Sequence, residues 1–156
     1  GAGSTGEMGA ASRGFKNGGG TIHGVVPEFF KNDLYEFVNW NCDELTVTKT
    51  MRERKGIMEN LADAFIITPG GCGTFEELFE VLTLKQLGQH RKPIAIYNID
   101  GYYDLLVGTL KYSIETEFVK PNCERLYRVF DENEFDKMID YIENDDMDGM
   151  TVHDLK

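Results

Sequence analysis

The stretch AFIITPGGCGTFEE, residues 64–77, indicates the fold of this chain. Residues 64–68 are apolar up to the final threonine, which is typical of a strand covered on both faces of a parallel sheet. Pro69 ends the strand, and three of the next four residues are glycines. Beyond the glycines, apolar residues recur at helical spacing. The stretch therefore predicts a strand, a glycine loop and a helix.

A loop of this kind suits a phosphate group. Glycines let the backbone approach a ligand without Cβ clashes, and the helix behind them offers unpaired N–H groups and the positive end of its dipole. The same pattern also fits a glycine-rich turn that binds no ligand. Two further alternatives concern single residues. Thr74 and Glu77 have the spacing of a capping box, and Cys72 lies where a helix N-terminus could stabilise a thiolate.

Outward from this stretch, short apolar runs alternate with longer amphipathic ones. The alternation predicts a parallel sheet with helices on both faces, an α/β protein with a Rossmann-like three-layer domain. A chain of 156 residues has the length of one such domain, which we expect to span residues 1–156. The predicted strands are Thr21–Val26, Glu44–Thr48, Ala64–Thr68, Pro93–Asn98 and Leu126–Phe130. The predicted helices are Met51–Leu61, Phe75 to near Gly88, Tyr102 to near Phe118, and Glu132–Ile142 with Asp131 as its cap, followed by an acidic, frayed tail after Asn144.

Two other segments fit a phosphorylated ligand. Gly1–Gly9 is a second glycine-rich loop that leads into a helix, and one phosphorylated ligand explains two such loops better than chance does. Arg52, Arg54 and Lys55 form a basic cluster in an acidic chain, although such clusters are often solvated helix faces. Because no strand precedes Gly1–Gly9, we expect the beginning of the domain to be absent from this sequence.

The net charge limits which binding partners we expect, and the cysteines indicate the cellular compartment. The chain has 27 acidic and 16 basic residues, a net charge of −11, so we expect no general attraction to nucleic acid or to anionic membranes. No apolar run approaches the roughly 20 residues of a membrane helix. Cys42, Cys72 and Cys123 are widely spaced and we find no signal peptide, which favours the cytoplasm. The three histidines show no metal-ligand spacing.

Seven short motifs occur in a fixed order along the chain. The longest are GAGSTGEMG at 1–9, MRERK at 51–55 and PGGCGTFEE at 69–77. Between and after them lie VVPE at 25–28, ADAF at 62–65, QLG at 86–88 and NIDGYY at 98–103. Together they resemble the motifs of the LONELY GUY (LOG) family, in which the three longest read GGGxxGxMG, MxxRK and PGGxGTxxE. Ala2 stands where the family's middle glycine is usual. The resemblance covers about the first three quarters of the chain, and it implies that the first strand and helix of the family's domain are missing.

The resemblance implies a phosphoribohydrolase. Such an enzyme cleaves the N-glycosidic bond of AMP or an N6-modified AMP, giving the free base and ribose 5-phosphate. It places the catalytic residues of the family on Arg54 and Glu77. It also implies a homodimer or larger assembly, a small-molecule nucleotide as partner, and neither a metal nor an organic cofactor. The nucleotide-binding positions that it implies are Gly3, Gly6, Glu36, Lys55, Gly70, Gly71, Cys72, Gly73, Thr74, Phe75, Glu76 and Thr83.

The chemistry of the bond agrees with these roles. Cleavage develops positive charge on the sugar and negative charge on the leaving base, and a carboxylate such as Glu77 can stabilise the sugar or activate water. Arginine is always protonated, so we assign Arg54 to electrostatic stabilisation of the phosphate or the base. A non-catalytic nucleotide-binding module of the same fold stays an alternative. An amino-acid decarboxylase would need a pyridoxal-phosphate lysine, which the sequence does not mark.

The segment between Pro27 and Cys42 is rich in aromatic residues. This density favours burial of some of them against a second copy of the chain, while packing on the sheet of the same chain is the alternative. The residues concerned are Phe29, Phe30, Tyr35, Phe37 and Trp40.

Overall fold

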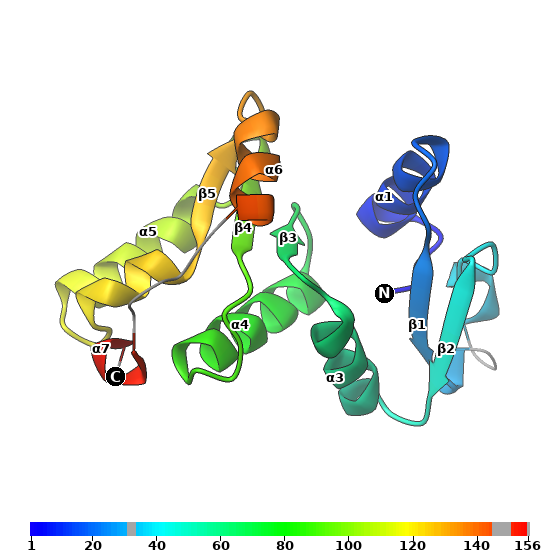
Figure 1. Ribbon diagram of the computed structural model, residues 1–156, viewed down its shortest axis with the longest axis horizontal. Coiled ribbons are helices and arrows are strands. Elements are labelled where there is room, and N and C mark those ends of the chain that lie inside the picture. Colours follow the sequence, from blue (N-terminus) through cyan, green and yellow to red (C-terminus); the bar gives the residue numbers. More distant parts are fainter. Residues whose placement is uncertain (31–33, 145–150, 156) are drawn as a thin grey trace. The chain divides into compact units, whose positions relative to one another are not determined.

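The computed structural model describes residues 1–30, 34–144 and 151–155. The chain comprises two compact units, Gly1–Ala62 and Asp63–Lys156, and each is described by itself. Within each unit the described strands pair in parallel and alternate with helices along the chain (Figure 1). The predicted α/β class with parallel strands is therefore confirmed, while the assignment of residues 1–156 to one domain stays a prediction.

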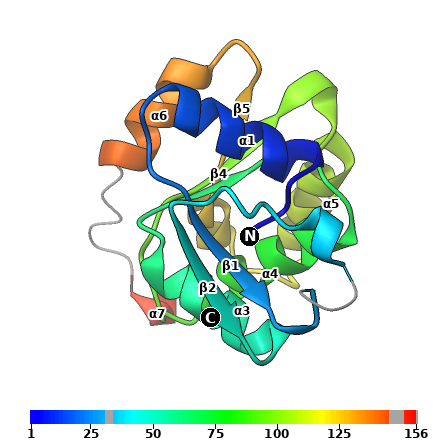
Figure 2. The same cartoon turned by 90° about the vertical axis from the view of Figure 1, so that its right-hand side faces the viewer.

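The first unit is built around a parallel pair of strands. Its elements are α1 (Gly6–Asn17), β1 (His23–Pro27), the 3₁₀ helix η1 (Tyr35–Phe37), β2 (Glu44–Thr48) and α3 (Met51–Leu61). Strands β1 and β2 lie side by side with Val25 opposite Thr46 (Figure 2). A small core gathers Ala2, Val26 and Val38, with Phe30 and Leu45 packed against them.

The bounds of β2 and α3 are those that the sequence predicts, because the start of α3 has a local signal. Thr50 is the N-cap, and its side chain accepts the N–H of Glu53 at 3.1 Å. The carboxylate of Glu53 in turn accepts the N–H of Lys49 at 2.8 Å. These reciprocal bonds satisfy orphan donors at the helix start, so the helix begins at Met51.

The second unit contains a three-stranded parallel sheet in the order β3-β4-β5. Its elements are β3 (Phe65–Ile67), α4 (Cys72–Gln86), β4 (Ile94–Asn98), the 3₁₀ helix η2 (Ile99–Gly101), α5 (Asp104–Glu115), the 3₁₀ helix η3 (Pro121–Leu126), β5 (Arg128–Asp131), α6 (Phe135–Asn144) and α7 (Val152–Leu155). In this unit each predicted strand and helix is found, with bounds that differ by a few residues.

The central strand β4 is covered on both faces. Ile94 and Ile96 belong to a core cluster that includes Leu78 and Leu82 of α4. Ala95, between them, belongs to a second cluster with Phe130, Met138 and Tyr141, the last two on α6. Since successive side chains of a strand point to opposite faces, the sheet of this unit lies between two helical layers. This is the three-layer arrangement that the sequence predicts.

Two helix starts in the second unit lie away from their predicted positions. Helix α4 begins at Cys72, three residues before Phe75, and its N-cap is Gly71, which has no side chain. Helix α6 begins at Phe135. Asp131 accepts the N–H of Asn133 at 2.7 Å and so forms a turn ahead of the helix, where a cap was predicted.

Part of the segment predicted to be a frayed tail, residues 151–155, is described by the structure. Residues 145–150 lie outside the described residues. Helix α7 follows them, and Leu155 is buried in the core of the second unit. The side-chain amide of Gln86 donates to the carbonyl oxygen of Leu155 at 2.9 Å. Among the described helices, none is both long enough and apolar enough to cross a bilayer.

Candidate active site

The glycine loop connects the end of β3 to the start of α4. Gly71 is the N-cap of α4; its backbone is extended, and it has no side chain with which to cap the first turn. The N–H of Thr74 donates to the carbonyl oxygen of Gly71 at 3.0 Å. The N-terminus of this 15-residue helix is therefore open. Its N–H groups and the positive end of its dipole suit an anion.

The start of α4 removes one alternative for Glu77. Because the helix begins at Cys72, Thr74 is the third helical residue and not the N-cap. A capping box requires its threonine in front of the helix, so the capping-box interpretation of Thr74 and Glu77 is wrong. Glu77 lies half-buried in the second turn of α4, and Glu76 beside it is exposed.

The folded protein requires glycine at one of the three glycine positions of the loop but not at the other two. A Cβ on Gly70 would lie 2.2 Å from Oγ1 of Thr74, so this close approach needs glycine. A Cβ on Gly71 or Gly73 would meet no described atom within 4 Å, and neither residue has a positive φ. Glycine at these two positions leaves open space at the helix start, as the close approach of a ligand requires.

Two tyrosines after β4 hold the loop by its carbonyl groups. The hydroxyl of Tyr102 donates to the carbonyl oxygen of Gly70 at 2.5 Å, and the hydroxyl of Tyr103 donates to that of Thr68 at 2.6 Å. Tyr103 is fully buried, and its ring meets that of Phe75 edge to face at 6.1 Å. Burial raises the pKa of Tyr103, with a smaller contribution from Tyr102, so the hydroxyl remains a donor.

Tyr102 and Tyr103 belong to the NIDGYY motif, but the sequence alone does not indicate their contact with the glycine loop. The available signal was their place after β4, which pairs with β3. The segments that follow neighbouring parallel strands emerge at the same edge of a sheet, so the loop after β4 lies near the glycine loop after β3.

In the first unit, Arg54 is buried and tied to β1. Its Nε donates to the carbonyl oxygen of Val25 at 3.1 Å. A Cβ on Gly1 would lie 2.5 Å from Nη2 of Arg54, so the glycine loop at residues 1–9 begins directly against the guanidinium. Lys55 follows on α3 and is half-buried. This unit thus places a buried positive charge beside the first glycine loop.

The same loop also contacts η1. The hydroxyl of Ser4 donates to the carbonyl oxygen of Glu36 at 3.2 Å, and Gly3 forms a β-bridge with Val38. Gly6 opens α1 with a φ of 57°, a left-handed conformation that favours glycine. Three predicted nucleotide-binding residues, Gly3, Gly6 and Glu36, are thus close to one another in the first unit.

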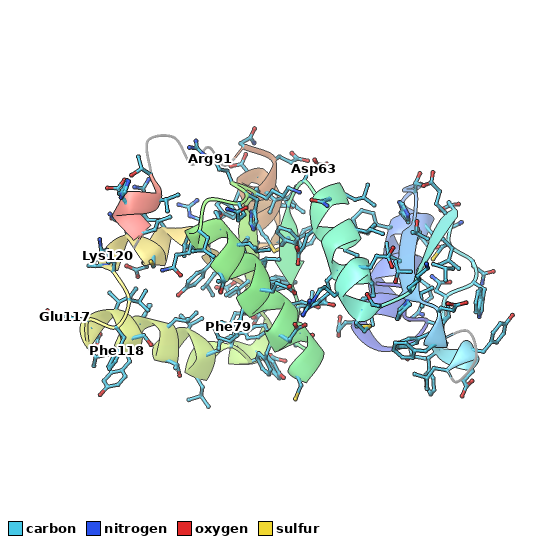
Figure 3. All side chains as sticks on the ribbon, turned by 90° about the horizontal axis from the view of Figure 1, so that it is seen from below. Asp63, Phe79, Arg91, Glu117, Phe118 and Lys120 are labelled. Atoms are coloured by element: carbon cyan, nitrogen blue, oxygen red, sulfur yellow. The ribbon has the colours of Figure 1, made fainter. Side chains whose placement is uncertain are left out.

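Thr83 lies apart from the glycine loop. It is exposed on α4 and lines a cavity of about 170 Å³ with Phe79, which Figure 3 labels on the same helix. The cavity wall continues along α5 and η3 and contains no charged residue. A cavity that no basic side chain lines does not suit a phosphate. The predicted contact of Thr83 with the nucleotide therefore stays a prediction.

The remaining candidates concern thiols and metals. Cys72 is the first residue of α4 and is exposed. Within residues 1–30, 34–144 and 151–155, no group of three His, Cys, Asp or Glu side chains could hold a metal ion. The second unit gathers Gly70–Glu77, and the first gathers Arg54, Lys55 and the loop at residues 1–9. The joint action of Arg54 and Glu77 stays a prediction.

A parallel sheet, a glycine loop after a strand and an uncapped helix N-terminus are the features of a nucleotide-binding α/β protein. Residues 8–141 match the model of the family described as possible lysine decarboxylase. The chain therefore belongs to that family, the LOG family of the sequence motifs, and the resemblance is confirmed.

Curated relatives agree with this assignment. The probable cytokinin riboside 5′-monophosphate phosphoribohydrolase LOG6 of Arabidopsis thaliana is 40% identical over 126 residues, which cover 81% of this chain and 62% of the relative. The probable cytokinin riboside 5′-monophosphate phosphoribohydrolase LOGL3 of Oryza sativa subsp. japonica is 39% identical over 126 residues. These residues cover 81% of this chain and 59% of the relative. The cytokinin riboside 5′-monophosphate phosphoribohydrolase LOG2 of Arabidopsis thaliana is 40% identical over 126 residues, covering 81% and 58%. The chain spans about three fifths of the length of these relatives.

Proposed function

We propose that the protein hydrolyses the N-glycosidic bond of AMP or an N6-modified AMP to the free base and ribose 5-phosphate. The open N-terminus of α4, with two glycines that the folded chain does not itself require, carries the proposal. The names of the curated relatives, which are phosphoribohydrolases of cytokinin riboside 5′-monophosphates, support the same reaction.

In this proposal the 5′-phosphate binds at the start of α4. The N–H groups and the helix dipole attract its negative charge. A fixed phosphate then orients the sugar for reaction, which lowers the barrier by restricting the geometry. The other nucleotide-binding positions implied by the family motifs remain part of the proposal.

Glu77 and Arg54 are the proposed catalytic residues. The carboxylate of Glu77 stabilises the cationic sugar of the transition state or takes the proton of the attacking water. The base leaves with its bonding electrons and a proton, while the water oxygen bonds to the anomeric carbon. The buried guanidinium of Arg54 stabilises negative charge on the phosphate or on the departing base.

An incubation of the full protein with a nucleotide panel tests the reaction. AMP and N6-substituted AMP should release free base, read by chromatography, whereas the corresponding nucleosides should not, because they lack the phosphate anchor. Equal turnover of adenosine and AMP contradicts the phosphate role. Binding of AMP without release of base would favour a non-catalytic nucleotide-binding module, and carbon dioxide from lysine would overturn the proposal.

We also propose that the protein is a homodimer. The aromatic segment leaves several rings exposed within the single chain: Phe29, Tyr35, Phe37 and Trp40. Only Phe30 of this group packs against the core of the first unit. Exposed aromatic residues are enriched at interfaces between proteins. Light scattering of the full protein at micromolar concentration should give twice the mass of one chain, and a monomer would contradict the proposal.

A cytoplasmic location completes the proposal. The three cysteines are free thiols in the structure, which suits a reducing compartment. The fluorescence of a fusion of the full protein should be distributed through the cytoplasm. Accumulation in a secretory compartment would contradict this location.

A further inference from the structure

We propose that Tyr102 and Tyr103 are positioning residues, which orient the glycine loop so that its N–H groups face a phosphate. This inference rests on the proposed function, because it assigns a task to the loop that is proposed to bind the substrate. It concerns two side chains outside the predicted site, and it is carried by hydrogen bonds between segments more than 30 residues apart in sequence.

The first step is the direction of one peptide group. All peptide bonds between the described residues are trans, and in a trans peptide the N–H points opposite to the carbonyl of the preceding residue. The Tyr102 hydroxyl fixes the Gly70 carbonyl at 2.5 Å. The N–H of Gly71 must then point away from Tyr102. Gly71 is the N-cap of α4, so its N–H joins the donors at the open helix end.

The second step is electrostatic. A carbonyl oxygen carries partial negative charge and repels a phosphate at short range. The two hydroxyls hold the oxygens of Thr68 and Gly70 in hydrogen bonds of 2.6 and 2.5 Å. Pro69, between these residues, has no N–H of its own. The tyrosines thus fix both carbonyl groups of a segment that has few N–H donors. The N-terminus of α4 is then the part of the loop that carries partial positive charge.

The tyrosines are themselves held in place by the turn after β4. The side-chain oxygen of Asn98 accepts the N–H of Tyr103 at 2.6 Å, and its amide donates to Asp104 at 2.8 Å. Asp100 and Gly101 adopt φ values of 51° and 70° and reverse the chain between the strand and the tyrosines. A Cβ on Gly101 would lie 2.7 Å from the carboxylate of Asp104, so the turn requires glycine. Residues in left-handed conformations persist where surrounding bonds enforce them.

Tyr102→Phe tests the inference, because it removes one hydroxyl from a ring that is 49% exposed and leaves the ring in place. The dissociation constant of AMP, measured by calorimetry, should rise about fivefold, the effect of one lost hydrogen bond. The KM for AMP should rise by the same factor, with kcat within about twofold, since the bond acts on phosphate binding. In ¹H–¹⁵N spectra, AMP should shift the Gly71 amide of the wild type strongly and that of the variant weakly.

Tyr97→Phe is the matched control. The hydroxyl of Tyr97 also donates to a backbone carbonyl, that of Glu132 at 3.2 Å, but it does not touch the glycine loop. Its loss should leave the AMP dissociation constant and the Gly71 shift unchanged. Tyr102→Phe with wild-type affinity, an equal loss in Tyr97→Phe, or a wild type that binds neither AMP nor inorganic phosphate overturns the inference. A wild type that binds AMP but releases no base contradicts only the proposed function.

Discussion

At the scale of the single residue, Glu77 offers the sharpest prediction. Since Thr74 lies inside α4, the carboxylate of Glu77 has no capping-box role. Glu77→Gln keeps the size of the side chain but removes the charge that would stabilise the sugar or activate water. Its kcat should fall by about two orders of magnitude or more. AMP affinity and the midpoint of denaturant unfolding should stay close to those of the wild type.

Glu143→Gln is the control for this substitution. Glu143 is an exposed carboxylate on α6, outside the proposed site. Its replacement should alter neither turnover nor unfolding. If Glu77→Gln turns over AMP as Glu143→Gln does, Glu77 is not the catalytic carboxylate.

At the scale of the element, the start of α4 makes Gly73 a test of ligand binding. Gly73→Ala adds a methyl group where no described atom lies within 4 Å. In the first turn of a helix it should be neutral or stabilising by up to about 1 kcal/mol. The same methyl group would stand in front of a bound phosphate, so AMP affinity should fall at least about tenfold, a steric loss of ~1.4 kcal/mol. Thermal unfolding and calorimetry measure the two effects separately.

Substitutions of two other glycines serve as comparisons for Gly73→Ala. Gly108→Ala, on α5, also meets no described atom within 4 Å and should match the stability change of Gly73→Ala without changing AMP affinity. Gly70→Ala drives a Cβ into Thr74, and should destabilise the protein by about 1–3 kcal/mol. Retained AMP affinity in Gly73→Ala would mean that no phosphate approaches this turn.

The connection between α4 and β4 contains a histidine that makes stability depend on pH. The N–H of Lys92 donates to Nδ1 of His90 at 3.2 Å, so Nε2 carries the proton and donates to the carbonyl of Val81 at 2.9 Å. Burial lowers the pKa of His90 below its usual 6.5, and the nearby charges of Lys85 and Lys92 lower it further. The neutral ring is therefore the form that stabilises the fold.

The sign of the effect follows from this lowered pKa. His90 contributes its stabilisation above about pH 6.5, and the contribution is lost as pH falls through the lowered pKa of the folded state. The urea midpoint of the wild type should thus drop between about pH 7.5 and 5.5. His90→Gln should show a smaller drop over the same interval, and an equal drop in both proteins would rule out His90 as the source.

At the scale of the whole molecule, the sequence predicts the order of elements well because burial leaves a periodic pattern. The bounds of β2 and α3 follow from local apolar runs and from the cap at Thr50. The predicted start of α4 was wrong because a glycine N-cap has no side chain that marks it in the sequence. Thr74 and Glu77, in contrast, have the spacing of a capping box although they lie inside the helix. The glycine loop was found because glycine spacing reports backbone geometry directly.

Contacts between distant segments have no such local signature. Tyr102 reaches Gly70 across 32 residues, and the burial of Leu155 depends on partners in α4 and η3. Periodicity in one segment cannot indicate which other segment covers it. The tyrosine contacts and the docking of α7 therefore emerged only from the structure, and the partnership of Arg54 with Glu77 stays a prediction.

The docked end of the chain gives a prediction at this scale. Leu155 is 4% exposed, and its carbonyl accepts bonds from Gln86 and from the thiol of Cys123 at 2.9 and 3.4 Å. Leu155→Ala should lower the free energy of unfolding by about 2 kcal/mol, the low end for a buried leucine because the segment can adjust. His153→Ala, exposed on the same short helix, should be neutral. Equal unfolding midpoints for the two variants would mean that α7 does not hold the core.

The different surroundings of the three thiols make the protein a convenient target for site-specific labelling. Cys72 is exposed at the start of α4, whereas burial raises the pKa of Cys42 and of Cys123 and lowers their thiolate fraction. A maleimide dye at limiting concentration should attach first to Cys72, without engineered substitutions. The fluorophore would then stand at the open helix end, where its emission can report arrival of a ligand in real time.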